Sequence, residues 1–291
     1  MKKLTQLEIN KLITKLLIND NDEDDFRNLE QELKKSICNK AVLGIDIYRY
    51  SQYKLLPQIL IPHLFKILYD LTVKNCLKHE PTIFKEFNLK KFREHFIDTG
   101  DGGFQIFENP FHAIIFSIYF QSNVARYNSN GSTTEKLNSI IGDITLRYTL
   151  TYDDVYSYET NHFGAGIINC ARIIARDKLN RFLIDENTKR WFIEKLNNVE
   201  NLAYLELWKE YEFFDFVKVG DGEKFESLIF SNTGNKIKNV DIMKIGEIKS
   251  KLDTLSIYNL HIQSLMFLTQ ASKFRKITIT LGNLNSNGLH D

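Results

Sequence analysis

A short apolar run, Ala41–Ile47, is interrupted by a single carboxylate, Asp46, and this feature constrains the chain more than any other. The run has the length and the β-branched content of a buried strand. A carboxylate in such a strand is costly unless it is paired, hydrogen-bonded or bound to a metal. The alternative interpretation is an aspartate at the end of the strand that caps the following turn.

A second aspartate, Asp101, lies in the turn Thr99–Gly103 between two strand-like segments. On its own this signal is weak, because Gly220-Asp221-Gly222 has the same composition and predicts an ordinary hairpin turn. Each aspartate stands at the edge of a strand, and if these strands lie side by side, Asp46 and Asp101 converge. Their oxygen atoms then suit Mg²⁺, which usually keeps water ligands and shares substrate phosphates.

A third polar element follows Gly164, where the sequence predicts a helix through Ala175. Asn169, Arg172 and Arg176 form one polar stripe on this otherwise apolar helix. A solvated helix face is the alternative, and for Arg176 it is the favoured interpretation. The planar, permanently charged guanidinium of Arg172 suits an oxyanion or a triphosphate that gains charge in a transition state.

Helical and strand-like segments alternate along most of the chain, which predicts a mixed α/β or α+β protein. Residues 1–37 carry leucines at helical spacing and predict an N-terminal helical extension. Residues 38–232 form the predicted main domain. Residues 236–291 are predicted to be a mostly helical accessory element, because apolar residues recur there at Ile245, Ile248, Leu252, Leu255 and Leu260.

Composition excludes several classes of function. The formal net charge is +1, so no basic excess indicates a nucleic-acid track. No apolar run approaches the roughly 20 residues that a bilayer-spanning helix needs. The three cysteines, Cys38, Cys76 and Cys170, are too few and too scattered for a disulfide framework or a zinc site. These observations predict a cytoplasmic protein without a membrane span.

Three motifs together resemble the class III nucleotide cyclases between about residues 40 and 185. They are Gly44-Ile-Asp46-Ile-Tyr-Arg-Tyr50-Ser, Thr99-Gly-Asp101-Gly-Gly-Phe and Gly164-x-Gly-x-x-Asn169-Cys-Ala-Arg172-Ile. The resemblance implies an α+β fold with a ferredoxin-like βαβ core, flanked here by the helical N- and C-terminal extensions. It also implies a head-to-tail homodimer with active sites between the subunits. Two Mg²⁺ or Mn²⁺ ions per site would support conversion of a nucleoside triphosphate to its cyclic monophosphate and pyrophosphate.

The same resemblance implies roles for individual residues. Asp46, Ile47 and Asp101 take the metal positions, and Arg172 stabilises the transition state. Asn169 orients the ribose, although it stands three residues before Arg172 where the family has four, which places Ile168 in that register. Lys218 resembles the lysine that binds the triphosphate, and a solvated strand lysine is the alternative.

The positions that read the base depart from both purine patterns. The residues there are Ile97 and Asn161, in place of the charged pair of adenylate cyclases or the corresponding pair of guanylate cyclases. Tyr50 adds a hydroxyl near the expected base, or packs in the core. The combination resembles the bacterial pyrimidine cyclases of Pycsar antiphage systems, whose cyclic UMP or cyclic CMP activates a separate effector. The alternatives are an adenylate or guanylate cyclase with divergent base readers, and a degenerate module that only dimerises or senses nucleotides.

Overall fold

The computed structural model describes residues 37–129, 135–158, 161–196, 236–249, 254–270 and 273–289, together with Lys11 and Thr14. The predicted N-terminal extension lies outside the described residues apart from Lys11, Thr14 and Ile37. Lys218 and the hairpin predicted around it also lie outside them. Within the described ranges no helix is long and apolar enough to cross a membrane.

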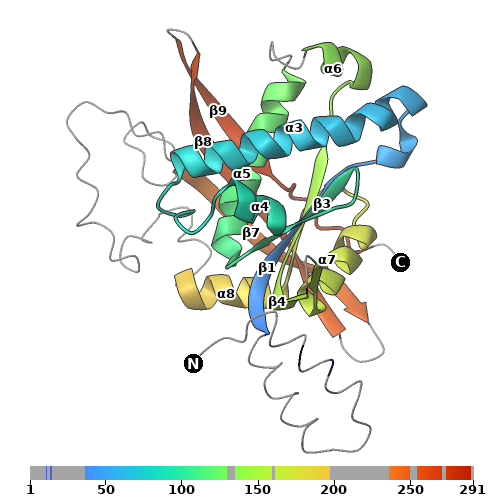
Figure 1. Ribbon diagram of the computed structural model, residues 1–291, viewed down its shortest axis with the longest axis vertical. Helices are drawn as coiled ribbons and strands as arrows, with labels where there is room; N and C mark the ends of the chain where they lie inside the picture. Colours follow the sequence, from blue (N-terminus) through green and yellow to red (C-terminus); the bar gives the residue numbers. More distant parts are fainter. Residues whose placement is uncertain are drawn as a thin grey trace, which may run out of the picture.

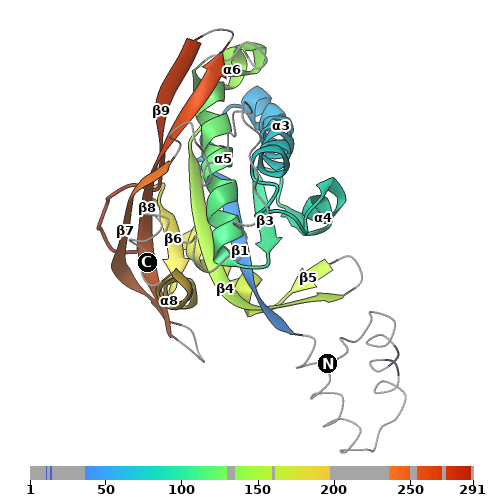
Figure 2. The same ribbon diagram turned by 90° about the vertical axis from the view of Figure 1, so that its left-hand side faces the viewer.

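One sheet organises the described part of the chain, and its strands follow the order β2-β3-β1-β4-β6-β8-β7, with β5 paired to β4 and β9 to β8. Neighbouring strands are antiparallel except β4 and β6, which are parallel. Figures 1 and 2 show β8 and β9 continuing as a long hairpin at one end of the molecule. The strands are β1 (Cys38–Ile47), β2 (Phe96–Asp98), β3 (Gly102–Phe107), β4 (Leu146–Tyr158), β5 (Asn161–Phe163), β6 (Phe182–Asp185), β7 (Lys236–Lys249), β8 (Thr254–Gln270) and β9 (Lys273–Leu281).

Helices cover both faces of this sheet, and Figure 2 shows α3 and α5 stacked against it. The side chains of Leu43 and Ile45 on β1 pack into the large core that α3 and α5 cover. Val42 points to the opposite face, where it packs with Cys170 of α7. The helices are α3 (Leu55–His79), α4 (Leu89–Glu94), α5 (Pro110–Asn128), α6 (Glu135–Ile141), α7 (Ala165–Arg176) and α8 (Glu186–Leu196), with a short 3-10 helix η1 (Tyr50–Gln52).

The α+β class predicted from the sequence is confirmed. Because β1 is buried on both faces, it reads as a continuous apolar run, as strands covered on both sides do. At the start of α5 the side chain of Asn109 accepts the amide of His112, and Pro110 occupies the first turn.

The prediction that residues 236–291 are mostly helical is wrong. They form β7, β8 and β9, and β8 pairs with β6, so these strands extend the same sheet instead of forming a separate element. The error has a physical cause. On β8, Ile257 packs on the face of α7, whereas Leu260 and Ile262 pack in the main core. Both faces of β8 are therefore buried in this part, and the apolar spacing from Ile245 to Leu260 also matches a helix.

Asp185, the last residue of β6, is a fully buried carboxylate. It accepts the backbone amide of Thr188 at 2.8 Å, which caps the start of α8. Burial raises its pKa to about 6, and the hydrogen bonds from Thr188 and Tyr152 offset only part of that effect. Ionising Asp185 in the folded chain is therefore costly, yet its side chain still caps the start of α8.

Asp185 is expected to make stability fall as pH rises. Between about pH 4 and pH 6 the folded chain holds a proton that the unfolded chain has released, so stabilisation is complete below pH 4 and is lost through pH 6. The shift corresponds to about 3 kcal/mol. Asp185→Asn keeps the acceptor without the charge and should remove this slope, measured by urea unfolding at pH 4.5, 5.5 and 7.5. Asp185→Ala should destabilise at every pH. Parallel pH profiles for wild type and Asp185→Asn would contradict the assignment.

Candidate active site

Asp46 and Asp101 meet at one end of the sheet. Asp46 near the end of β1 pairs in register with Gly102, the first residue of β3. The amide of Ile47 donates to the carbonyl oxygen of Asp101 at 3.1 Å, which fixes the turn against the end of β1. Burial raises the pKa of Asp46 most, and the nearby charge of Asp101 raises it further. The structure therefore brings Asp46 and Asp101 to the same end of the sheet, as the sequence predicts.

Glycine is required at two positions of the turn that carries Asp101. Gly100 has φ +94°, a conformation that side chains disfavour, and its amide donates to Asp98 Oδ1 at 2.7 Å. At Gly102, a β-carbon would lie 2.1 Å from the carbonyl oxygen of Ile45. These glycines let the turn press against β1, which brings the carboxylate of Asp101 close to that of Asp46.

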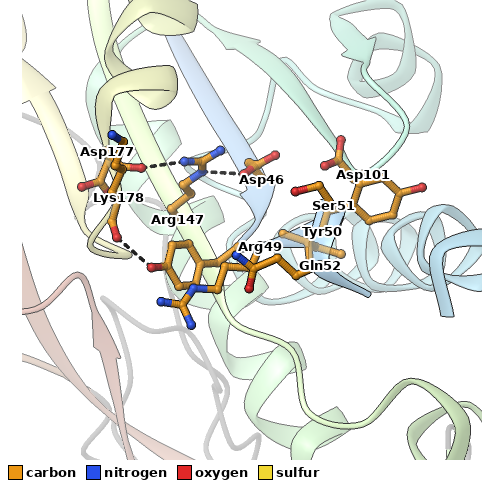
Figure 3. Close-up of a pocket in the computed structure, with 11 residues that line it drawn as sticks. Asp46, Arg49, Tyr50, Ser51, Gln52, Asp101, Arg147, Asp177 and Lys178 are labelled. Carbon is orange, nitrogen blue, oxygen red and sulfur yellow. Dashed lines mark hydrogen bonds and ion pairs between the residues drawn. The ribbon is translucent and has the colours of Figure 1, made fainter. Parts of the chain in front are cut away.

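The two carboxylates line a pocket of about 460 Å³ (Figure 3). Three cationic side chains, Arg49, Arg147 and Lys178, line the same pocket. Arg49 is in the left-handed region with φ 61°, and its guanidinium lies 5.0 Å from the centre of the Tyr48 ring. The complete lining is Asp46, Ile47, Tyr48, Arg49, Tyr50, Ser51, Gln52, Asp101, Arg147, Asp177 and Lys178. The pocket therefore combines the charges that bind cations with those that bind anions.

Arg147 on β4, like Arg49 and Lys178, is a pocket residue that sequence reasoning missed. Its Nε donates to Asp46 Oδ2 at 2.5 Å and its Nη1 donates to the carbonyl oxygen of Asp177 at 2.6 Å (Figure 3). The signal for it is positional, because Arg147 stands directly opposite Asp46 in the pairing of β1 with β4. That pairing joins segments about a hundred residues apart, so it could not be located from the local sequence.

Burial raises the pKa of Asp46 to about 6, Arg147 lowers it, and Asp101 raises it further. The side chain of Asp46 is only 19% exposed. Asp46 pairs with Arg147, and the nearby charge of Asp101 opposes its ionisation, so additional positive charge beside the two carboxylates would favour their ionised forms. A divalent cation between them would supply that charge.

The donor set fits Mg²⁺ or Mn²⁺. Asp46 and Asp101 offer hard carboxylate oxygens. Ile47 also lines the pocket, and because its side chain is apolar, only its main-chain carbonyl oxygen could be a metal ligand. Among the described residues, no group of three or more His, Cys, Asp or Glu side chains could hold a metal ion. An ion here would take its remaining ligands from water and substrate, as Mg²⁺ usually does.

The three predicted base-binding residues lie in different surroundings. Tyr50 lines the pocket, and its hydroxyl donates to the carbonyl oxygen of Gln58 at 3.0 Å. Ile97 on β2 packs on the apolar cluster of Val42 and Cys170. Asn161 is exposed on β5. Ile97 and Asn161 do not line the pocket, so within one chain only Tyr50 is brought to the two carboxylates.

The two predicted catalytic residues on α7 also lie apart from the pocket. Asn169 is half-buried, and its amide donates to Asp153 Oδ2 at 3.2 Å. Arg172 is exposed and makes no hydrogen bond or ion pair with the other described residues. Ile168, which stands in the register of the ribose-orienting residue, is 53% exposed. Among the described residues, α7 contributes no side chain to the lining of the pocket.

No family profile matches the sequence, and no curated protein matches it significantly. Solved structures with a similar arrangement include an adenylate/guanylate cyclase/hydrolase from Silicibacter pomeroyi, 12% identical, covering 77% of this chain and 96% of that one with TM-score 0.42. Another is the adenylyl cyclase CyaB from P. aeruginosa, 12% identical, covering 76% and 93% with TM-score 0.39.

A third is the guanylate cyclase domain of RhGC from Catenaria anguillulae, solved with GTP, 12% identical, covering 76% of this chain and 95% of that one with TM-score 0.42. Because all three TM-scores lie below 0.5, the function proposed next is drawn from the residues and their geometry.

Proposed function

We propose that this protein is a metal-dependent nucleotide cyclase that converts a nucleoside triphosphate to its 3′,5′-cyclic monophosphate and pyrophosphate. The observation that carries the proposal is the convergence of Asp46 and Asp101 from neighbouring strands into a pocket that also holds cationic side chains. A triphosphate with divalent cations matches both sets of charges. The class III motifs in the sequence independently lead to the same residues.

In the proposed reaction the ribose 3′-oxygen attacks the α-phosphorus, the bond from that phosphorus to the bridging oxygen of the β-phosphate breaks, and pyrophosphate leaves. The proton of the 3′-hydroxyl passes to solvent. Divalent ions would activate the hydroxyl and neutralise the charge that develops on the phosphates. Asp46 and Asp101 would hold these ions, and Arg147 would keep the Asp46 carboxylate oriented. Arg49 and Lys178 would attract the triphosphate.

We propose a homodimer in which each site is completed by the second subunit. The support is that Asp46 lines the pocket, whereas Arg172 is exposed on α7 and does not line it. A symmetric pair of chains could bring Arg172 of one subunit to the carboxylates of the other. Asn169 or Ile168 would accompany it, and Lys218 stays a proposed triphosphate ligand.

The proposed substrate is UTP or CTP, and we further propose that the product activates a separate effector in antiphage defence. Ile97 offers no hydrogen bond where a purine reader would stand, and its side chain is engaged in apolar packing. The exposed amide of Asn161 can still donate and accept. A site that lacks the hydrogen-bonding partners of a base discriminates against that base.

Incubation of purified protein with each of the four triphosphates and Mn²⁺ or Mg²⁺ tests the proposal. We expect UTP or CTP to be turned over at least ~10-fold faster than ATP or GTP, which needs only ~1.4 kcal/mol of differential transition-state binding. Asp101→Asn protein serves as the blank. A preference for ATP or GTP would favour a purine cyclase with divergent base readers. No turnover of any triphosphate would favour the non-catalytic module.

A further inference from the structure

One wall of the pocket is a short loop whose position depends on the chain's most C-terminal described residues. Residues 177–181 connect the end of α7 to the start of β6. Two of them, Asp177 and Lys178, line the pocket. In this loop Asn180 is in the left-handed region with φ 54°, so the backbone needs tertiary contacts to keep its path.

Four successive carbonyl oxygens of the loop divide between two directions. Those of Asp177 and Lys178 face the pocket, where they accept Arg147 Nη1 at 2.6 Å and the Tyr48 hydroxyl at 2.7 Å (Figure 3). The carbonyl oxygens of Leu179 and Asn180 face away from it, and both accept the side-chain amide of one residue, Asn283, each at 2.8 Å. The side-chain amide of Asn283 therefore holds the carbonyl oxygens of Leu179 and Asn180, while the preceding two carbonyl oxygens of the loop orient Arg147 and Tyr48.

A buried ion pair adds a second attachment. Arg181 is fully buried and its Nε donates to Asp177 Oδ1 at 2.9 Å. Its Nη1 donates to the carbonyl oxygen of Asn287 at 2.5 Å. A buried guanidinium needs such partners, because each donor left unsatisfied is costly. Residues 283–289, which we call the strap, thus contact both the side chain and the backbone of the loop.

The strap is itself held in place. Asn259 on β8 donates to the carbonyl oxygen of Asn283 at 2.6 Å. Within the strap, Asn283 Oδ1 accepts the amide of Asn285, and Asn285 Oδ1 accepts the amide of Asn287, each at 3.0 Å. Leu289 packs against Ile245 of β7 and its apolar neighbours. The sequence of contacts therefore runs from the sheet through the strap and the loop to Tyr48 and Arg147.

We infer that the strap positions the pocket wall, and that Asn283 is a positioning residue for nucleotide binding. The effect on nucleotide binding rests on the proposed function, whereas the hydrogen-bonded connection between the strap and residues 177–181 does not. Loosening the strap should leave the chain folded but let residues 177–181 open locally. The carbonyl oxygens that orient Tyr48 and Arg147 would then lose their fixed places, and binding would weaken more than the chemical step.

Asn283→Asp tests this inference, because it is isosteric, removes the amide donor and turns a negative charge toward two carbonyl oxygens. The matched control is Asn285→Asp, which adds the same charge two residues away and keeps the oxygen that accepts Asn287. The first readout is hydrogen exchange without nucleotide at the amides of Leu179 and Arg181, which donate to Asp177 and do not contact Asn283. We expect roughly 10-fold faster exchange in Asn283→Asp than in the control.

The second readout is a comparison of KM with kcat for UTP. We expect KM to rise about 5-fold in Asn283→Asp with a smaller fall in kcat, since the loop lines the pocket directly and reaches Asp46 only through Arg147. If this variant does not fold, Asn283→Ala removes the same donors without adding charge. Unchanged exchange at residues 179 and 181 in a folded variant would overturn the inference. Absence of turnover in wild type would overturn the proposed function, and the exchange comparison would still decide the role of the strap.

Discussion

Replacing either aspartate of the pocket by asparagine is expected to reduce cyclase activity by at least ~10³-fold, a loss of about 4 kcal/mol of transition-state stabilisation. Asparagine matches aspartate in size but lacks the charge that would hold a divalent cation. Asp46→Asn and Asp101→Asn should therefore fail equally at saturating Mn²⁺. The measurement is product formation, together with Mn²⁺ binding followed by electron paramagnetic resonance, which does not depend on turnover.

The fold should survive these two substitutions. Burial raises the pKa of Asp46 to about 6, so its ionised form at pH 7 is less stable in the folded chain than in the unfolded chain, and the neutral amide should not lower the melting temperature. Asp154→Asn provides the matched control, since the same change is made at an exposed position of β4. Near-normal turnover in either pocket variant, with Asp154→Asn behaving like wild type, would rule out a mechanism based on the two aspartates.

Mixing two inactive chains is expected to restore about a quarter of the wild-type activity. Asp46→Asn supplies an intact Arg172, and Arg172→Ala supplies an intact pair of aspartates. Random pairing makes about half of the dimers hybrid, and each hybrid holds one complete site of two. The recovery follows from the placement of Arg172 on an exposed face outside the pocket.

Subunit exchange must be shown by differently tagged chains before the complementation result is interpreted. Arg190→Ala, which removes an exposed arginine on α8, should be active alone and serves as the control for loss of surface charge. If the mixed chains exchange subunits and remain inactive, the active site is contained within one chain. In that case Arg172 acts within its own chain and not across a dimer interface.

The two aspartates could be predicted from the sequence because each one conflicts with its surroundings. Asp46 interrupts an apolar strand, and Asp101 lies in a glycine-rich turn, so both signals are local. Arg147 could not be predicted in this way, because its role depends on the pairing of β1 with β4. An arginine in an exposed strand and an arginine opposite a buried carboxylate look the same in a sequence.

The prediction for residues 236–291 was wrong for a different reason. Prediction from periodicity relies on one solvent-exposed face and one buried face, whereas both faces of β8 are buried in its central part. Asn259 and His261 are nearly as buried there as Ile257 and Leu260. Tyr258, Leu260 and Ile262 do alternate with Asn259, His261 and Gln263, which is a local strand signal, but the apolar spacing from Ile245 to Leu260 also matches a helix. Asn259 is buried because its amide holds the strap, which no local pattern could indicate.

The way β6 is enclosed sets an order of events during synthesis of the chain. β6 pairs with β4, which precedes it, and with β8, which is made more than seventy residues later. A nascent chain can form the β1–β4 pairing, and with it the pair of Asp46 and Arg147, before β8 has left the ribosome. The wall of the pocket is completed only when residues up to 289 have emerged and docked. We therefore expect the binding surface to assemble late, because non-local contacts form slowly.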